Sequence, residues 1–197
     1  DGGGQTAGWY IDEVTLVTGL PMTLTPNVPE GFESGLGDWA AEAGTWQTGV
    51  PTYGPPTNAA GSRAHAGSQC ANYARYVDSR LICASFTVPA ADQNPRLRFW
   101  HWYETQQGYD YGVVEIRAGT NAWRTVSWQY TGTSIAWTRP SVDLAAYAGQ
   151  SVQVAFRFVS NTSGEYAGWY IDEVTLVTGL PTTLTPNVPE GFESGLG

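Results

Sequence analysis

The carboxylate with the clearest potential for chemistry is Asp172. It lies in the run Gly168–Leu176, whose alternating pattern predicts a strand. That pattern places Asp172 on the same strand face as Tyr170, Val174 and Leu176. Because an unpaired carboxylate is costly to bury, Asp172 is expected to have a partner.

The expected partner is a metal ion held with Glu33, which follows Phe32 near the other end of the chain. Hard oxygen ligands with no His or Cys nearby favour Ca²⁺ over zinc, so a structural Ca²⁺ is predicted. Glu173 and Asp78 are the reserve ligands. The alternative is that backbone amides or an arginine satisfy the carboxylate.

Catalytic motifs are missing from the sequence. It contains neither His-Glu-x-x-His, typical of zinc peptidases, nor Gly-x-Ser-x-Gly, typical of serine hydrolases. His65 lies in an Ala-Gly turn, and His101 among Trp residues is expected to pack in a core. Glu104 and Asp110 could form a glycosidase pair, but a solvated or metal-bound loop is the favoured interpretation. We therefore predict a protein that is not an enzyme.

Aromatic residues offer a second kind of chemistry, because the chain has 9 Trp and 11 Tyr. Exposed aromatic rings are the flat platforms on which carbohydrate-binding modules hold sugars. The residues nearest predicted loops are the candidates: Trp46, Tyr53, Tyr73, Tyr76 and Tyr109. Mid-strand residues are expected to pack in the core instead: Trp100, Trp102 and Tyr103.

The two cysteines, Cys70 and Cys83, are separated by twelve residues. A disulfide between them would close a short loop and add about 3 kcal/mol of stability. Two free buried thiols are the alternative. With the formal glycosylation sequon at Asn161, the disulfide favours an oxidising, extracellular setting.

The charge restricts the partners of this 197-residue chain. Its formal net charge is -9, and all nine basic residues are Arg. Nucleic acids and anionic membranes are therefore poor partners, whereas neutral glycans are not excluded. No apolar stretch reaches the ~18 residues that a membrane-spanning helix requires.

Short alternating segments punctuated by Gly, Pro, Asn and Ser predict an all-β protein. Asp143–Ala148 could form one helical turn, but no longer helix is expected. The clearest strands are Leu97–Glu104, Gly112–Ala118, Ser151–Val159 and Gly168–Leu176. Many short strands of this kind are typical of a two-sheet antiparallel sandwich.

An internal repeat sets the predicted organisation. Residues 7–37 recur at 167–197, with Thr182 in place of Met22 as the only difference. Such identity indicates a tandem-repeat protein. We predict the end of a preceding repeat at 1–18, a Pro/Thr linker at 19–30, a complete repeat at 31–178, a second linker at 179–190 and the start of the next repeat at 191–197.

The repeated strand poses a question of assembly. Its apolar residues are Trp9, Ile11 and Val14 in the first copy and Trp169, Ile171 and Val174 in the second. Either the second copy closes its own sandwich, which is favoured, or strands are exchanged between neighbouring repeats to build a fibre.

A family resemblance rests on an ordered set of motifs. They are Gly31-Phe-Glu-Ser34, Trp39, Gly44-Thr-Trp-Gln47, Gly49-Val-Pro51, Gly54-Pro55, Ala64–Gly67, Phe99–Glu104, Tyr109–Ile116, Trp123, Val142–Gly149 and Gly168–Val174. The set resembles the MAM-like jelly-roll modules of immune-inhibitor-A-type metallopeptidases. It is also similar to the cleaved-adhesin (choice-of-anchor J) modules of bacterial surface proteins.

The resemblance implies a two-sheet jelly roll in an extracellular, non-catalytic role, often with structural calcium. It also implies adjacent first and last strands, which would bring Glu33 close to Asp172. We predict a surface fibre, stalk or adhesin whose partners are neighbouring repeats, with self-assembly into fibres and glycans as further options. The alternatives are a carbohydrate- or ligand-binding adhesin module, or an accessory domain of a secreted metallopeptidase.

Overall fold

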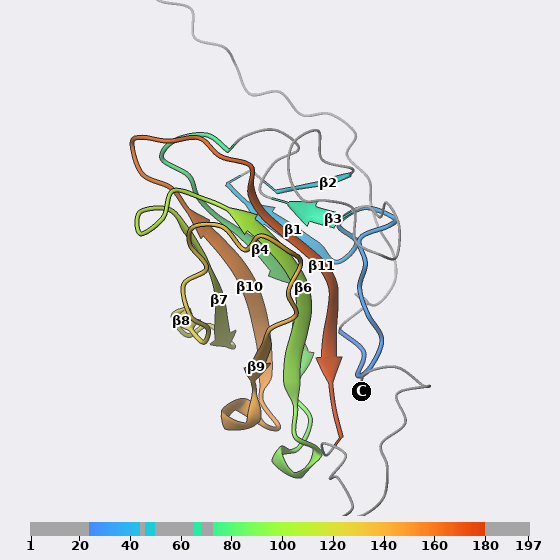
Figure 1. Cartoon of the computed structure of the whole chain (residues 1–197). Helices are drawn as coiled ribbons and strands as arrows, with labels where there is room; N and C mark the ends of the chain where they lie inside the picture. Colours follow the sequence, from blue (N-terminus) through green and yellow to red (C-terminus); the bar gives the residue numbers. More distant parts are fainter. Residues whose placement is uncertain (1–23, 44–45, 50–64, 68–72, 180–197) are drawn as a thin grey trace, which may run out of the picture.

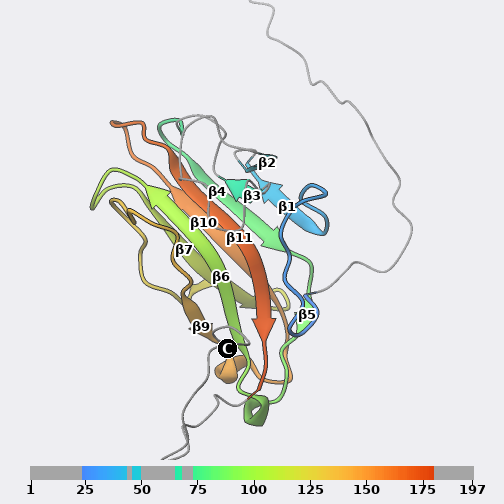
Figure 2. The ribbon, with the colours of Figure 1, turned by 45° about the vertical axis from the view of Figure 1, so that its right-hand side comes forward.

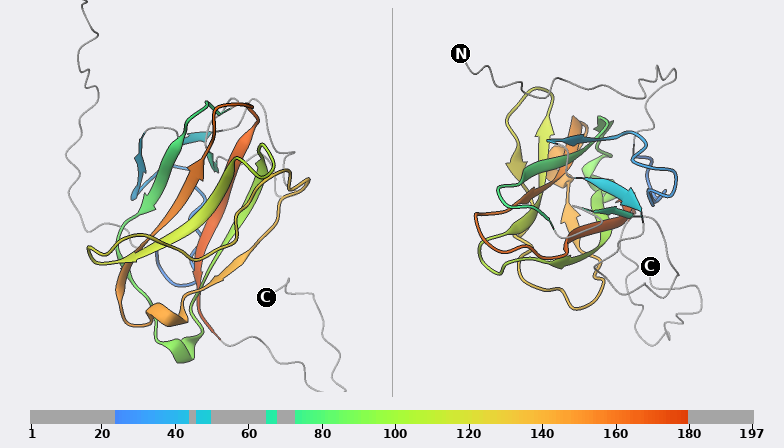
Figure 3. Two further views of the ribbon diagram at one scale, coloured as in Figure 1. Left: turned by 90° about the vertical axis from the view of Figure 1, so that its left-hand side faces the viewer. Right: turned by 90° about the horizontal axis from the view of Figure 1, so that it is seen from above.

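Two antiparallel sheets face each other in a computed structural model of the chain, which describes residues 24–43, 46–49, 65–67 and 73–179 (Figure 1). One sheet has the order β1-β4-β10-β7-β8, with β5 also paired to β10, and the other has the order β2-β3-β11-β6-β9. Figures 2 and 3 show the two layers from other directions. The predicted two-sheet antiparallel jelly-roll sandwich is therefore confirmed.

The strands agree with the alternating segments of the sequence. Their bounds are β1 Trp39–Glu42, β2 Gln47–Gly49, β3 His65–Gly67, β4 Asp78–Cys83, β5 Phe86–Thr87, β6 Arg96–Glu104, β7 Tyr111–Ala118, β8 Arg124–Thr125, β9 Ser141–Asp143, β10 Ser151–Val159 and β11 Gly168–Val177. Two short 3-10 turns, Ala91–Gln93 and Ala145–Tyr147, complete the described elements. No helix in these residues is long and apolar enough to span a membrane.

The core between the sheets is built from aromatic rings. Phe156 of β10 lies 4.9 Å from Phe99, 5.6 Å from Trp39 and 5.6 Å from Trp169, measured between ring centroids. The contacts with Phe99 and Trp169 are edge-to-face and the contact with Trp39 is stacked, and such ring pairs add to the free energy of burial. Gly112 of β7 is required by the same packing, because a Cβ atom there would lie 2.5 Å from Cδ2 of Trp169.

The strand β11 contains a bulge that changes which of its residues face the core. Its register with β6 shifts between Asp172 and Thr175, and Glu173 has a positive φ of 46°. One extra residue in a strand reverses the alternation beyond it. Tyr170 and Asp172 therefore face outward while Val174 faces the core, so the prediction that these three share a face is wrong.

A segment we call the strap, residues 24–34, lies along the end of β11. The Glu30 and Val174 backbones exchange two hydrogen bonds of 2.9 Å, and the Asn27 amide donates to the Leu176 carbonyl at 2.8 Å. Phe32, only 1% exposed, anchors the strap in the core. Residues 24–30, predicted as linker, thus pair with the sandwich.

The repeated strand closes its own sandwich in this structure. β11 lies between β3 and β6, and Trp169, Ile171 and Val174 are completely buried in its core. The first copy, with Trp9, Ile11 and Val14, lies outside the described residues. Strand exchange between neighbouring repeats therefore stays a prediction.

Candidate ligand-binding site

The strap brings Glu33 and Asp172 to the same place, beside the β11 bulge. A Cβ atom built on Gly31 would lie 3.7 Å from Oδ1 of Asp172 and 4.0 Å from Oε1 of Glu33. Asp172 is 1% exposed, and its Oδ1 accepts a 2.7 Å hydrogen bond from the Glu173 amide. Part of its charge is thus satisfied by the backbone, which was the alternative to a metal ion.

The reserve metal ligands differ in position. Glu173 occupies the bulge itself, whereas Asp78 lies on the other sheet and pairs with Arg157 at 2.7 Å. Hydrogen bonding to that guanidinium lowers the pKa of Asp78. Among the described residues, no group of three His, Cys, Asp or Glu side chains could hold a metal ion. A calcium ion beside Glu33 and Asp172 would need backbone oxygens to complete its ligands, as Ca²⁺ commonly does.

His101 is a core residue, as the sequence predicts. It is 2% exposed, and its Nδ1 accepts a 3.1 Å hydrogen bond from Nε1 of Trp169. Burial lowers its pKa to about 3, so the ring is neutral at physiological pH. The imidazole is therefore closed off from any solvent-borne substrate.

Asp110 is also structural, and the prediction of a solvated or metal-bound loop is wrong for it. It is fully buried, and its carboxylate accepts hydrogen bonds from the Tyr73 hydroxyl at 2.5 Å and the Asn161 amide at 2.8 Å. Burial and this hydrogen bond raise the pKa of Tyr73. The carboxylate ties together three loops at one end of the sandwich.

The predicted sugar-binding aromatics divide into two groups. Trp46 is 4% exposed and Tyr73 is 1% exposed, so their assignment to a binding surface is wrong. Tyr76 and Tyr109 are 75% and 64% exposed and lie in the loops around Asp110. Tyr53 lies outside the described residues.

Cys83 is a free, buried thiol whose Sγ accepts a hydrogen bond from the Val154 amide at 3.1 Å. Burial raises its pKa to about 12. Cys70 lies outside the described residues, so the structure does not show the predicted disulfide.

A groove that the sequence did not reveal runs along the open edge of the sandwich, between β8 and β9. It has a volume of about 520 Å³ and Trp128, 88% exposed, stands at its rim. The polar side chains of Ser127, Ser141 and Asp143 contribute to its lining. Trp128 follows a two-residue strand in an irregular segment, where no periodicity distinguishes an exposed Trp from a buried one.

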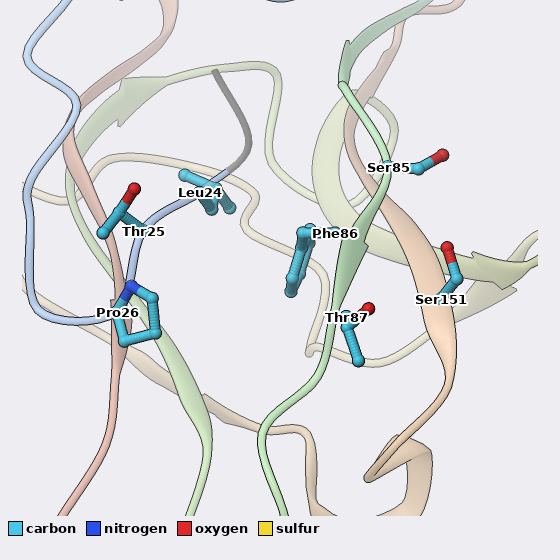
Figure 4. Close-up of a pocket in the computed structure, with 7 residues that line it drawn as sticks. All are labelled: Leu24, Thr25, Pro26, Ser85, Phe86, Thr87 and Ser151. Carbon is cyan, nitrogen blue, oxygen red and sulfur yellow. The ribbon is translucent and has the colours of Figure 1, made fainter. Parts of the chain in front are cut away.

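A second hollow, of about 360 Å³, lies between the strap and β5 (Figure 4). Leu24 and Pro26 of the strap form one side of it, and Phe86 of β5 forms the other. Its only aromatic side chain, Phe86, is 3% exposed and belongs to the core. This hollow offers no exposed ring and no charged side chain, so the Trp128 groove is the better candidate.

The outer face of the β4-β10-β7 sheet carries a ladder of paired charges. Arg80 reaches Glu115 at 2.8 Å and Glu42 at 3.1 Å, and Arg157 reaches Glu115 at 3.2 Å and Asp78 at 2.7 Å. Every charged group of this ladder has a partner. Because these charges already have partners, a charged ligand would add little binding free energy at this face.

The outer face of the other sheet is different, and we call it the arginine–tryptophan face: Arg96, Arg98, Trp100 and Trp102 of β6, with Arg139 beside them. Leu97 and Phe99 face the core, so the alternate residues must point outward. The core assignment of Trp100 and Trp102 is therefore wrong, although Trp102 is buried in a small outer cluster with Tyr170. Tyr103 packs against the main core, as predicted.

The comparison with known sequences gives two curated relatives. The chain is 31% identical over 179 residues, 89% of its length, to Bacillopeptidase F of Bacillus subtilis. It is 30% identical over 118 residues, 55% of its length, to the pre-pro-metalloprotease PrtV of Vibrio cholerae. The chain spans only 12% and 13% of these relatives. No family model matches the chain.

Solved structures with the same fold include a cleaved adhesin domain of Lys-gingipain from Porphyromonas gingivalis. It matches with a TM-score of 0.55 and 20% identity, covering 77% of this chain and 98% of the adhesin domain. This chain has the two-sheet β-sandwich fold of that domain. The predicted resemblance to MAM-like and cleaved-adhesin modules is thus confirmed.

The β-sandwich also shares its fold with carbohydrate-binding modules. TmCBM61, solved in complex with beta-1,4-galactotriose, matches with a TM-score of 0.51 and 17% identity, covering 74% of this chain and 92% of TmCBM61. At this level of identity the match shows the fold alone. Any ligand of this β-sandwich must be argued from its own surface.

Proposed function

We propose that this module binds glycans outside the cell and that the ligand lies in the Trp128 groove. The observation that carries the proposal is the 88% exposure of Trp128 at the rim of a 520 Å³ groove. An exposed indole beside a groove offers a flat apolar surface to a ligand. Its flat face can pack on a sugar ring while Ser141 and Asp143 supply hydrogen-bonding groups. The Ser127 hydroxyl already bonds to the Val114 amide and the Trp128 carbonyl.

The comparisons support this proposal at the level of fold. The neighbours include an adhesin domain and a carbohydrate-binding module solved with beta-1,4-galactotriose, and both are β-sandwiches of this architecture. An extracellular location is consistent with the adhesin neighbour and with the Asn161 sequon. Both lines of support point to recognition rather than to turnover.

A glycan array followed by calorimetric titration of the best hit tests the proposal. Trp128→Ala should weaken binding at least about ten-fold, as expected for an aromatic hot spot. Tyr109→Ala is the matched control, because Tyr109 is also exposed, at 64%, but lies in the loops around Asp110. Unchanged affinity in Trp128→Ala, or loss in Tyr109→Ala alone, would move the site away from the groove.

We also propose that the module is non-catalytic and accessory. Support comes from His101 and Asp110, two residues whose side chains could take part in catalysis. Both are buried, and both form hydrogen bonds within the fold. The relatives are proteases of which this chain spans about an eighth. In such a protein the module would hold the protease near a glycan-bearing surface. Release of reducing ends from a bound glycan would contradict the non-catalytic assignment.

A tandem array that forms a surface fibre or stalk is the second proposal. It is supported by the near-identical segments 7–37 and 167–197, which are 160 residues apart. Multiple copies would also raise avidity for a repetitive glycan surface. Electron microscopy of the full-length protein tests this, since a single compact particle would exclude an array.

A structural Ca²⁺ between Glu33 and Asp172 is the third proposal. It is supported by the placement of both carboxylates beside Gly31. An ion present at 100 times its dissociation constant would add about 2.7 kcal/mol of stability, a rise of roughly 5 °C or more in melting temperature. Glu33→Gln should abolish that rise. An unchanged melting temperature in EDTA would overturn the proposal.

A further inference from the structure

The arginine–tryptophan face carries positive charge that the fold leaves uncompensated. Within the described residues, Arg96, Arg98 and Arg139 form no ion pair, in contrast to the fully paired ladder on the opposite sheet. The Nε atoms of all three are buried without a hydrogen-bond partner. Three of the nine cations in a chain of net charge -9 thus gather on one face. Asp143 lies opposite Arg96 in the register, but no carboxylate of the described residues forms an ion pair with these arginines.

The orphaned polar atoms of this face are all donors. Besides the three guanidinium Nε groups, Nε1 of Trp102 is buried without an acceptor. An unpaired buried donor costs about 1–3 kcal/mol. A face that keeps four such groups is poor for stability but well suited to a ligand that supplies acceptors.

The guanidinium group of Arg98 is repelled by those of Arg96 and Arg139. Burial and the neighbouring charges of Arg139 and Arg96 lower the pKa of Arg98. Arg139 lies over the Trp100 ring, 5.7 Å from its centroid, and this stacking holds the guanidinium in place. A ligand anion would relieve the repulsion and find a pre-oriented fork of N–H donors.

The arginine–tryptophan face and the Trp128 groove meet across β9. Ser141 of β9 pairs with Arg98, and Asp143 pairs with Arg96, so both lie on the same side of the sheet as the arginines. Ser141 and Asp143 also line the groove. A saccharide that lies on Trp128 can therefore extend over the edge of β9 to the guanidinium groups.

We infer that the glycan bound in the Trp128 groove carries a carboxylate-bearing sugar unit, which Arg98 and Arg139 recognise. This inference rests on the proposed glycan-binding function. The guanidinium group is planar and binds a carboxylate through two parallel hydrogen bonds. Arg139 lies over the Trp100 ring, and Arg98 precedes Trp100 by two residues on the same face of β6, so a sugar carboxylate at this ring would meet N–H donors of both arginines.

Charge limits the ligand to isolated carboxylates. The net charge of -9 opposes approach of a dense polyanion such as a nucleic acid or an anionic membrane. Asp143 lies opposite Arg96 in the register, so the anion is placed at Arg98 and Arg139 rather than at Arg96. A largely neutral glycan with occasional uronic acid units fits this balance.

The experiment compares one acidic oligosaccharide with its neutral counterpart. The probes are a uronic-acid-containing oligosaccharide selected on the array and the same molecule after chemical reduction of its carboxyl groups. Arg139→Gln and Arg98→Gln should each weaken binding of the acidic probe by about ten-fold, as expected for a charged hydrogen bond. Both should leave the reduced probe within about two-fold. Arg124→Gln, an exposed arginine of β8 with the same change in charge, is the control.

A second variant distinguishes a loss of ligand recognition from a loss of folding stability. Arg139→Lys retains the charge but loses the planar fork, so it should weaken the acidic probe and keep the melting temperature. The inference would be supported if Trp128→Ala weakened binding of both probes while the arginine variants weakened binding of the acidic probe alone. Equal affinity of the two probes for the wild-type protein would overturn it and leave glycan binding intact. Failure of every glycan would overturn the proposed function itself.

Discussion

Acidification should destabilise the module through one residue, His101. Its ring is 2% exposed, and its Nδ1 must be unprotonated to accept the hydrogen bond from Trp169. Protonation in the folded state would place a charge among aromatic rings and break that bond. Burial therefore lowers the pKa of His101 from 6.5 to about 3.

The size of the effect follows from proton linkage. Above pH 6.5 the ring is neutral in both the folded and the unfolded chain, and the stability that depends on the neutral ring is fully present. As the pH falls from 6.5 towards 3, the unfolded chain binds the proton and the folded chain does not, so the free energy of unfolding falls. At pH 5 the loss is about 2 kcal/mol relative to pH 8.

Urea denaturation at pH 8 and pH 5 measures this loss, with His101→Gln as the comparison. The Gln side chain can accept a hydrogen bond from Trp169 but does not titrate. The variant is expected to be less stable at pH 8, yet its loss between pH 8 and pH 5 should be about 2 kcal/mol smaller than in the wild type. An equal loss in the two proteins would show that His101 is not buried as a neutral ring.

Three further variants or modifications test the packing. Gly112→Ala should lower the free energy of unfolding by about 3 kcal/mol, because its Cβ overlaps the Trp169 ring; an unchanged thermal melt would contradict this contact. Asp110→Ala should cost about 3 kcal/mol by leaving buried donors unpaired, and a loss below ~0.5 kcal/mol in urea denaturation would show that they find other acceptors. Cys83 should resist iodoacetamide at pH 8 until the protein is unfolded, because its pKa is raised to about 12; fast labelling of native protein, read by mass spectrometry, would refute its burial.

The long strands could be predicted because period-two alternation is a strong signal. Ser151–Val159 has the predicted bounds, and Arg96–Glu104 begins one residue before the prediction. The short strands could not be predicted, because β2, β3, β5, β8 and β9 are only two or three residues long. Segments of that length show no periodicity, and only pairing with a neighbour makes them strands.

The side of a sheet to which each side chain points was harder to predict than the secondary structure. Alternation shows that Trp100 and Trp102 share a face, but it does not show which face is the core. The bulge at Glu173 adds a residue that no local pattern reveals, and it separates Asp172 from Val174. The unpaired arginines were missed for the same reason, since a missing ion pair is a property of the fold and not of spacing.

Two hydrogen bonds between Asn27 and Thr178, of 2.9 and 3.0 Å, have a mechanical consequence. They hold the point where the chain reaches the sandwich next to the point where it leaves. In an array, the segments between modules would therefore form one continuous linker chain, to which each module is attached at a single point. The modules would not be stacked end to end as a rod. Asn187, the second copy of Asn27, follows Thr178 by nine positions (187 minus 178), so each module would add at most roughly 30 Å to the length of this linker chain. Under tension the backbone hydrogen bonds between the strap and β11 would break one at a time. The linker chain would therefore lengthen before force acts on any core strand.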